Sequence, residues 1–582
     1  MSEKDGKIGG VSTVTEISSV SEHLQDESNK VHRNPFQRFV DGFKPLPSQF
    51  DNIDPNMTEV ERANYISTRT PLKRKLKSRH LQMISIGGAI GTGLFVGSGG
   101  ALRNGGPAAV LIAWILVGAM MFCTVHSLGE LCVAFPVSGS YAQYNTRFIS
   151  HAWGFAMCWN SAMSSMVTLP LELVAASMTI KFWNVDVSPA VWVTLFWLMI
   201  VIINLFGVKG YGEAEFVFSL CKVLAIIGFI FLGVILICGG GPKGGYIGGK
   251  YWHDPGAFSH GVKGVCKVFV TAAFSFSGTE TCGLAAAETA NPRKSLPKAT
   301  KQVFWRICLF YIVGLSLVGL LVPYNDPQLL GGKGSYDASV SPFVIAIKNG
   351  GIKGLPSVMN VVIMISVLSV GNTCVYSCSR VLVSLSEQGF APRSFGYIDR
   401  QGRPLVGVCF CLTFGLLCYL SVLKNESTVF TWMLSLSGLS SFFSWASICA
   451  SHFRFRLALK ANGRSTDELS FASAVGIYGS YFGFGLICVV LILEFWVSLF
   501  PGSTADAENF FETWLCVPVI ILFLVSYIIW KKRLPGLIPI KDIDIDSGRR
   551  VADLDLLRQE IAEEREELAS KPFLYRMYRF WC

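Results

Sequence analysis

The sequence predicts an all-α polytopic membrane protein with about twelve transmembrane helices. Of its 582 residues, 51% are apolar and only 15% are charged, whereas charged residues make up roughly a quarter of a soluble domain. The charged residues gather in the tails and in short connectors, which leaves apolar runs of about twenty residues, enough to cross a bilayer as a helix. The net charge of +10 is therefore read as a bias of the cytosolic loops, and no nucleic-acid partner is expected.

Composition divides the chain into three parts. Residues 1–80 are polar, serine-rich and charged, which predicts a mostly disordered cytosolic tail without a signal peptide. Residues 81–531 hold the apolar runs, and residues 532–582 form a second cytosolic tail. The 17 cysteines are scattered without paired spacing, so we expect no metal site, cofactor or disulfide framework. We also find no nucleophile or nucleotide-binding pattern, and an enzyme is not expected.

Hydrophobic runs and turn signals place the individual spans. The expected spans are 82–102, 107–135, 153–183, 190–206, 216–238, 264–287, 302–323, 355–385, 406–423, 429–453, 478–500 and 511–530. Basic residues concentrate in alternate connectors, and this bias predicts that both termini are cytosolic, as an even number of spans requires.

The first span is interrupted by glycine, in the run ISIGGAIGTGLFVGSG from Ile84 to Gly99. Glycine is a poor helix former, so we expect the helix to unwind there. Unwound backbone at membrane depth is tolerated where it meets a ligand, water or protein, and half-helix ends favour ionic groups. The pattern favours a site for a zwitterion, and a glycine-smooth helix-packing surface is the alternative. A phosphate-binding loop is not expected, because the G-x-G-x-x-G spacing is absent.

A matching interruption lies in the sixth span. The segment FSFSGTE, from Phe274 to Glu280, places small and hydroxyl residues and an acid in mid-span. Spans one to five and six to ten are then two halves that each begin with a broken helix. This correspondence indicates an inverted repeat with a site at the membrane midplane.

Ionisable residues inside spans are costly and usually face a cavity or a partner. We favour a functional role for Glu172, near the middle of span three, and for Glu280, which either pairs with a cationic substrate or carries a proton. Glu130, near the cytosolic end of span two, suits a structural salt bridge. Glu494 suits an interfacial position at the outer end of span eleven.

Ordered motifs along the chain allow a family to be recognised. They include RHLQMISIGGAIGTGLFVGSG, FGVKGYGEAEFVFS, GGKYWHDPGAF, FVTAAFSFSGTE and NPRKSLPKA, within a region from about Asn56 to Cys582. They resemble the yeast amino-acid transporter family of the amino acid–polyamine–organocation superfamily, above all its general amino-acid permeases. The resemblance implies a LeuT-like five-plus-five inverted repeat and proton-driven import of a broad range of L-amino acids at a fungal plasma membrane.

The resemblance also implies positions for the substrate. Contacts to its carboxylate fall on the first break, at Ala89, Ile90, Gly91, Thr92 and Gly93. Contacts to its ammonium fall on backbone carbonyls of the second, at Phe274, Ser275 and Ser277, where Phe276 either gates the site or simply packs. Ser164 and Ser437 match positions that line the side-chain pocket in relatives selective for basic amino acids, with helix-packing serines as the alternative.

Proton coupling is expected at Lys222 in span five. With the cytosolic boundary at Phe216, Lys222 lies ~9 Å inside the membrane, near the limit for snorkelling to water. The alternative is an ammonium that points inward, toward the carbonyls of the first break and toward span eight with Ser369 and Asn372. Sodium-coupled members of this fold bridge these helices with a metal ion, and the resemblance implies that a protonated lysine replaces it, with Glu172 or Glu280 as the other proton carrier.

The tails carry the remaining expectations. Lys4 and Lys7 either accept ubiquitin from a ligase machinery or are simply solvated lysines. The aromatic and basic end before Cys582 suits a membrane anchor with a palmitoyl chain on that cysteine, as the resemblance also implies. A nutrient sensor and an amino-acid or polyamine exchanger on the same fold are the alternatives to a proton symporter.

Overall fold

The structure is a computed structural model, and the part of the chain that it describes is almost entirely helical. The described residues are 41–45, 76–88, 90–137, 139–243, 245–289, 292–330, 341–423, 426–502, 504–532 and 536–549, with short stretches between 559 and 576. Ala89, Lys4, Lys7 and Cys582 lie outside them. Within these ranges, β pairing is limited to isolated bridges.

Eight helices of the described ranges are long and apolar enough to cross a membrane. They are α6 (Pro107–Ala134), α8 (His151–Ile180), α10 (Gly207–Ile237), α13 (Pro292–Arg306) continued by α14 (Gly314–Leu321), α17 (Leu355–Glu387), α18 (Leu405–Gly415) continued by α19 (Leu420–Leu423), α20 (Glu426–Ala461) and α21 (Gly476–Leu499). The pair α22 (Ala507–Trp514) and α23 (Cys516–Lys531) is long and apolar enough only when taken together, and its two helices are bent by 58°. The helix α9 (Pro189–Leu205) is shorter but apolar.

The first and sixth spans are both interrupted. The first consists of α4 (Ser78–Gly87), the π-helical turn η1 (Gly93–Gly97) and α5 (Ser98–Gly105). The sixth consists of α11 (Gly261–Phe276) and α12 (Thr281–Ala287). With these two, the helices follow the expected order of twelve spans and confirm a polytopic helical fold with broken helices one and six.

The glycines of the first break are required by close packing as well as by unwinding. A Cβ on Gly87 would lie 2.1 Å from the Ser219 hydroxyl of α10, and one on Gly93 would lie 2.5 Å from the Ser275 Cα of α11. Contacts this short leave no room for a side chain. The unwinding and the close-packing interpretations of this stretch therefore both apply.

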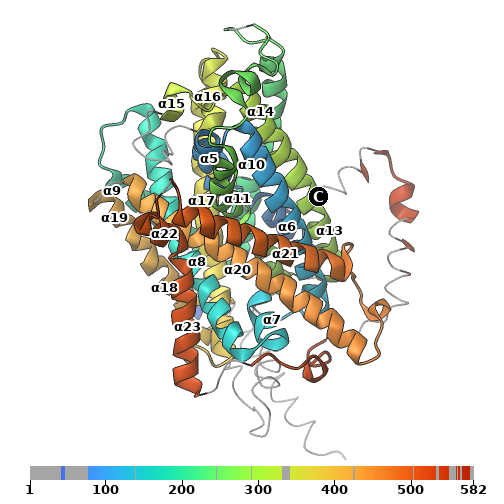
Figure 1. The fold of residues 1–582 in the computed structure, drawn as a ribbon. Coiled ribbons are helices and arrows are strands. Elements are labelled where there is room, and N and C mark those ends of the chain that lie inside the picture. Colours follow the sequence, from blue (N-terminus) through green and yellow to red (C-terminus); the bar gives the residue numbers. More distant parts are fainter. Residues whose placement is uncertain are drawn as a thin grey trace, which may run out of the picture.

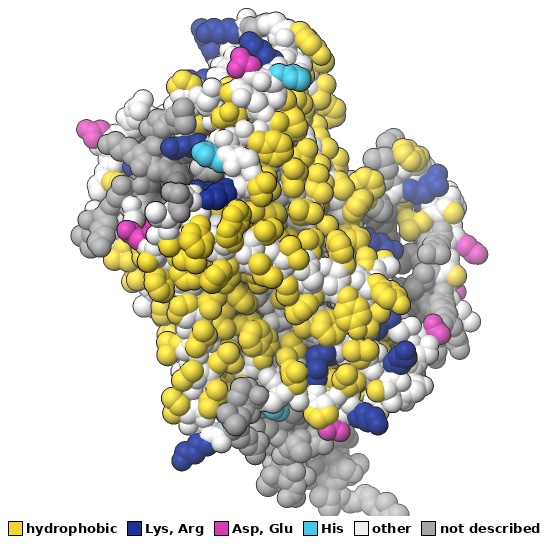
Figure 2. All heavy atoms as spheres, viewed as in Figure 1, with side chains coloured by type: hydrophobic (Ala, Val, Ile, Leu, Met, Phe, Trp, Pro, Cys, Tyr) yellow, Lys and Arg dark blue, Asp and Glu magenta, His cyan; other side chains and the backbone are white. Residues whose placement is uncertain are grey.

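The helices α8 and α17 pack together along the middle of the bundle, behind α20 and α21 in the view of Figure 1. Short helices cap its two ends, with α7 (Tyr141–Phe148) at one and α15 (Pro327–Leu330) and α16 (Pro342–Asn349) at the other. Figure 2 shows a broad band of apolar side chains between two ends that carry most of the visible charge. Such a band is the surface expected of a protein that is solvated by lipid.

The expected start of the fifth span and the expected position of Glu494 are wrong. The helix α10 starts at Gly207 and not at Phe216, which places Lys222 fifteen residues into it, or ~23 Å along the helix. The Lys222 side chain is fully buried, which excludes snorkelling and agrees with an ammonium that points inward. Glu494 is also buried, at 3% exposure, and is not interfacial. The first error arose because the ends of a hydrophobic run do not mark the ends of its helix. The second did not, since α21 has nearly the expected ends, Gly476–Leu499. Burial of Glu494 depends on neighbouring helices, which the sequence of one span does not reveal.

The structural role expected of Glu130 is confirmed. Its carboxylate accepts two hydrogen bonds from Arg456, at 2.7 and 2.5 Å, and one from the Ser473 backbone N–H at 2.6 Å. His452 Nε2 lies 3.1 Å from it. The cluster joins α6 to α20 and to the segment before α21, so it holds these helix ends together.

The described part of the C-terminal tail lies against the same end of the bundle. Arg147 of α7 donates to the carbonyls of Asp544 and Ser547, at 2.8 and 2.7 Å, and Ile543 and Ile545 are buried. Burial would raise the pKa of the Asp544 carboxyl, but Arg147 and hydrogen bonds to residues 546 and 547 hold that pKa below its usual range. The segment 536–549 is therefore held partly by an ionised carboxylate.

We expect Asp544→Asn to loosen this segment at neutral pH. Because the pKa of Asp544 is lowered in the folded protein, its contribution is fully present above the ordinary pKa of about 4 and is lost as the pH falls through the lowered value. Limited proteolysis of residues 536–549 should be a few-fold faster in the variant at pH 7. Asp542→Asn, at an exposed neighbouring position, is the matched control, and equal rates for both variants would contradict this role.

Candidate functional site

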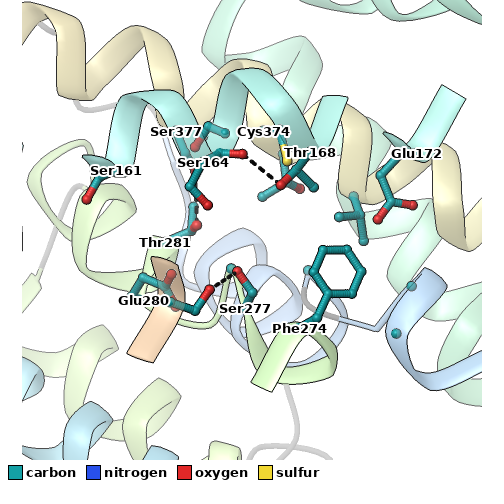
Figure 3. Close-up of a pocket in the computed structure, with 18 of the residues that line it drawn as sticks. Ser161, Ser164, Thr168, Glu172, Phe274, Ser277, Glu280, Thr281, Cys374 and Ser377 are labelled. Carbon is teal, nitrogen blue, oxygen red and sulfur yellow. Dashed lines mark hydrogen bonds between the residues drawn. The ribbon is translucent and has the colours of Figure 1, made fainter. Parts of the chain in front are cut away.

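A polar cavity opens where the two broken spans meet α8, α17 and α20. Eleven of its 21 lining residues are serine or threonine, and its acids are Glu172 and Glu280. Among the described residues that line it, none is basic. Figure 3 shows α8 along one wall, with the side chains of the sixth span on the opposite wall. The cavity can therefore offer hydroxyl groups and negative charge to a small polar ligand.

The first break supplies backbone to this cavity. Gly91, Thr92 and Gly93 line it together with Gly88, whereas Ile90 is buried and does not line it. The hydroxyl of Thr92 donates a hydrogen bond to Glu172 of α8. The second carboxylate oxygen of Glu172 has no hydrogen-bond partner in the described part of the chain. This oxygen can therefore accept a hydrogen bond from a ligand in the cavity.

The second break divides into residues that face the cavity and residues that do not. Phe274, Ser277 and Glu280 line it, whereas Ser275 and Phe276 do not. The carbonyl of Ser275 accepts a hydrogen bond from Tyr311 at 2.7 Å, and the ring of Phe276 packs against the Tyr311 ring with centroids 4.3 Å apart. In this structure Phe276 therefore packs in the core and does not cover the cavity.

Hydroxyl groups of α8 and α20 meet beside the second break. Ser164 lines the cavity, and Ser437 lies behind it, fully buried. The Ser437 hydroxyl is 2.7 Å from that of Thr168 and 3.5 Å from that of Ser164. Figure 3 shows Ser164 and Thr168 on the wall opposite Ser277 and Phe274. Ser164 can therefore touch a ligand directly, whereas Ser437 acts through its neighbours.

At the far end of the cavity, the Glu280 carboxylate accepts a hydrogen bond from the indole N–H of Trp445 at 3.3 Å. Tyr141, Ser161 and Ser377 line the same cavity. Sequence reasoning missed these residues and Trp445, because nothing in their local sequence distinguishes them from packing residues of a span. It also missed Arg306, fully buried in α13, which donates to the Ser85 carbonyl at 2.6 Å.

The ammonium of Lys222 points inward. It donates to the Gly87 carbonyl at the first break, at 2.9 Å, and to the Ser369 hydroxyl of α17, at 2.7 Å. Asn372 does not join this contact, since its side-chain oxygen accepts from Asn204 of α9 at 2.8 Å. Glu215, 3.8 Å from the ammonium, was missed. It lies in the quoted motif FGVKGYGEAEFVFS, two helical turns before the lysine, so a helical-face analysis of α10 would have found it.

A polar cavity between two interrupted helices, with a buried lysine that ties one interruption to a neighbouring span, defines a secondary transporter. The family model described as amino acid permease matches residues 80–536, and the chain belongs to this family. The expected family and the assignment as a transporter are thereby confirmed.

The chain is similar to two named fungal relatives over almost its whole length. It is 58% identical to the general amino-acid permease GAP2 of Candida albicans over 558 residues, which covers 96% of this chain and 95% of the relative. It is 56% identical to the general amino-acid permease GAP1 of Saccharomyces cerevisiae over 554 residues, 94% of this chain and 92% of the relative. Among solved structures it is similar to a manganese transporter of Eremococcus coleocola, with a TM-score of 0.48 at 12% identity, over 85% of this chain and 97% of that one.

Proposed function

We propose that this amino acid permease imports a broad range of L-amino acids across the plasma membrane by proton symport, with both termini in the cytosol. The observation that carries the proposal is the buried Lys222 ammonium, which joins the Gly87 carbonyl to the Ser369 hydroxyl beside the cavity. A lysine is a cation only while it is protonated, so a bridge of this kind can respond to a proton gradient. The names of the two relatives support breadth of substrate.

The proposed binding mode uses the parts that all amino acids share. The substrate carboxylate meets backbone N–H groups at Gly91, Thr92 and Gly93, at the N-terminal end of the outer half of span one. The substrate ammonium meets carbonyls at Phe274 and Ser277, where the inner end of α11 is interrupted. Because backbone groups bind the part that all amino acids share, the variable side chain of the substrate occupies the hydroxyl-lined region of the cavity.

The direct test is radiolabelled uptake of several amino acids in permease-deficient cells, with and without a pH gradient. We expect uptake of many amino acids that rises as the external pH falls and collapses with a protonophore. Exchange that ignores the gradient would instead indicate an exchanger. Binding without any transport would indicate a nutrient sensor.

Substitution at Ser164 should narrow the substrate range without abolishing transport. Ser164 lines the cavity from α8, on the wall opposite Ser277 and Phe274, so a bulkier side chain fills space that only large substrates need. We expect Ser164→Leu to lower uptake of arginine or tryptophan by roughly tenfold or more while glycine uptake stays near wild type. The control is Ser526→Leu, on the exposed face of α23. Equal loss for glycine and arginine would refute this role.

The tails enter the proposal as regulatory elements. Palmitoylation of Cys582 would hold the aromatic C-terminal end at the membrane, and Lys4 and Lys7 would accept ubiquitin. Metabolic labelling with an alkynyl fatty acid tests the first, since Cys582→Ser should remove the label and leave transport intact. Loss of ubiquitin conjugates in the Lys4→Arg, Lys7→Arg double variant tests the second.

A further inference from the structure

Glu215 is a buried acid in contact with the proposed coupling group. It lies on α10 and is fully buried, and one of its oxygens is 3.8 Å from the Lys222 ammonium. Its carboxylate oxygens accept hydrogen bonds from the Ser369 hydroxyl, at 2.8 and 2.7 Å, and from the Ser219 hydroxyl, at 3.1 Å. A buried carboxylate is costly unless it is paired and hydrogen-bonded, and both conditions are met here.

Ser369 connects the two charged groups in one direction. Its oxygen accepts a hydrogen bond from the Lys222 ammonium at 2.7 Å, and its O–H points at the Glu215 carboxylate. A hydroxyl that accepts on one side and donates on the other is the arrangement through which a proton can be relayed. Ser369 comes from α17, so the relay exists only while α17 and α10 keep this packing.

We propose that Glu215 is the group that receives the proton of Lys222, through Ser369, on its way to the cytosol. This inference rests on the proposed proton symport and names the residue that completes it. In the step, an N–H bond of the ammonium breaks as an O–H bond forms on Ser369. The original O–H bond of Ser369 breaks as one forms on Glu215, which leaves a neutral amine and a neutral carboxylic acid.

The position of Glu215 along α10 gives the relay its direction. The helix begins at Gly207, at the end of the bundle that the proposed topology places in the cytosol. Glu215 lies eight residues from that start, ~12 Å along the axis, and Lys222 lies ~23 Å along it. The backbone of Glu215 is therefore two helical turns nearer the cytosol than that of Lys222, although the two side-chain groups are 3.8 Å apart. Transfer to Glu215 thus places the proton on a side chain that is attached nearer the cytosol.

Loss of the proton from Lys222 also releases the first break. The ammonium donates at once to Gly87 and to Ser369, whereas a neutral amine has one N–H fewer and no charge with which to hold both. The bridge between α4 and α17 weakens as the proton leaves. Proton release and opening toward the cytosol thus become parts of one event.

Other ionisable groups surround this pair. Glu172 of α8 acts electrostatically on Lys222, and Tyr211 of α10 acts on Glu215. His80 of α4 packs against Gly212, one turn below Glu215. Cys374 lies on α17, and Arg380 of the same helix is paired with Glu288 at 2.8 Å. Glu172 is thus a further carboxylate near Lys222, and it also lines the cavity.

The competing interpretation is that Glu215 is a fixed counter-ion. Ser369→Ala tests the relay against this interpretation, because it removes the relay hydroxyl and leaves both charges in place, so full coupling in this variant would leave Glu215 as a counter-ion only. Ser366→Ala is the matched control, since this buried serine of α17 donates only to the carbonyl of Val362 in its own helix. Glu215→Gln keeps the shape of the side chain but cannot accept the proton.

The experiment uses the full chain in vesicles with the membrane potential clamped at zero. Under a gradient of about one pH unit, symport of one proton per substrate accumulates substrate by up to ~10-fold. We expect Glu215→Gln and Ser369→Ala to lose this accumulation and the accompanying proton flux. In both variants, exchange of labelled for unlabelled amino acid at equal pH should fall less than accumulation, and Ser366→Ala should accumulate substrate like wild type.

Different results would overturn proton symport and the relay through Glu215. If wild type moves no protons with substrate, proton symport itself is wrong. If wild type is coupled and Ser369→Ala remains fully coupled, the relay is overturned and Glu215 is a counter-ion, while symport stands. If Glu215→Gln does not fold, as judged by size-exclusion chromatography, Ser369→Ala alone decides the question.

Discussion

Replacing Lys222 with alanine will abolish concentrative uptake while part of the exchange activity survives. The fully buried ammonium is the cation that bridges the first break and α17, through Gly87 and Ser369. Without it no protonated group ties these elements together, so accumulation under a gradient of about one pH unit should fall from up to ~10-fold to simple equilibration. The measurement is substrate accumulation in vesicles, together with exchange at equal pH on the two sides.

The Lys222→Ala variant is also expected to be less stable, and the experiment must distinguish this loss of stability from the loss of proton coupling. Removing Lys222 leaves Glu215 buried without its counter-charge, which can destabilise a protein by about 3–5 kcal/mol. The double variant Lys222→Ala, Glu215→Gln removes both charges and should recover expression without recovering accumulation. Accumulation against the gradient at low external pH by either variant would show that the proton takes another route, with Glu172 or Glu280 next to be tested.

Replacing Gly91 with valine will abolish uptake of every substrate and leave the protein at the cell surface. A Cβ at this position would lie 2.4 Å from the Val370 side chain of α17, so the break must move away from its place in the cavity wall. Since we propose that this backbone holds the carboxylate that all amino acids share, no substrate should escape the effect. Thr92→Ile should act in the same way, because it removes the hydrogen bond to Glu172 and fills the cavity.

The matched control for this prediction is Gly228→Val. Gly228 also lies in a spanning helix, but a Cβ there would meet nothing within 4 Å. Uptake initial rates for glycine, leucine and arginine, normalised to surface protein, decide the outcome. Normal transport of any of them by Gly91→Val would place the common binding site elsewhere.

Much of the fold could be predicted from local sequence. The length of an apolar run sets whether a helix can span a bilayer, and a cluster of glycines sets where it unwinds, so the order of the spans and the breaks in the first and sixth were correct. The ends of helices were less accurate. The helix α10 begins nine residues before its apolar run, because polar residues at its start pack against α4, as at Glu213 and Arg79, which are 2.7 Å apart.

The site could be predicted where a local break or an intramembrane charge marks it, as at Glu172 and Glu280. The glycine-rich break pointed to Gly91, Thr92 and Gly93, which line the cavity. Contacts between side chains from distant segments were mostly not predicted. The hydrogen bond from Trp445 to Glu280 is an example, since these two residues are 165 positions apart in the chain. Phe276 could not be assigned from the sequence either, because its orientation depends on Tyr311 in another helix.

By itself, the sequence determined that this chain is a helical membrane protein, where two of its helices break, and to which family it belongs, because these depend on composition and on residues close together in the chain. Tertiary structure alone decided which acid lies beside Lys222. Ser369, 147 residues away, was expected near the lysine, but only the structure set Glu215 on the other side of the same hydroxyl. The physical reason is that a buried charge is tolerated only with partners in place, and those partners are supplied by helix packing.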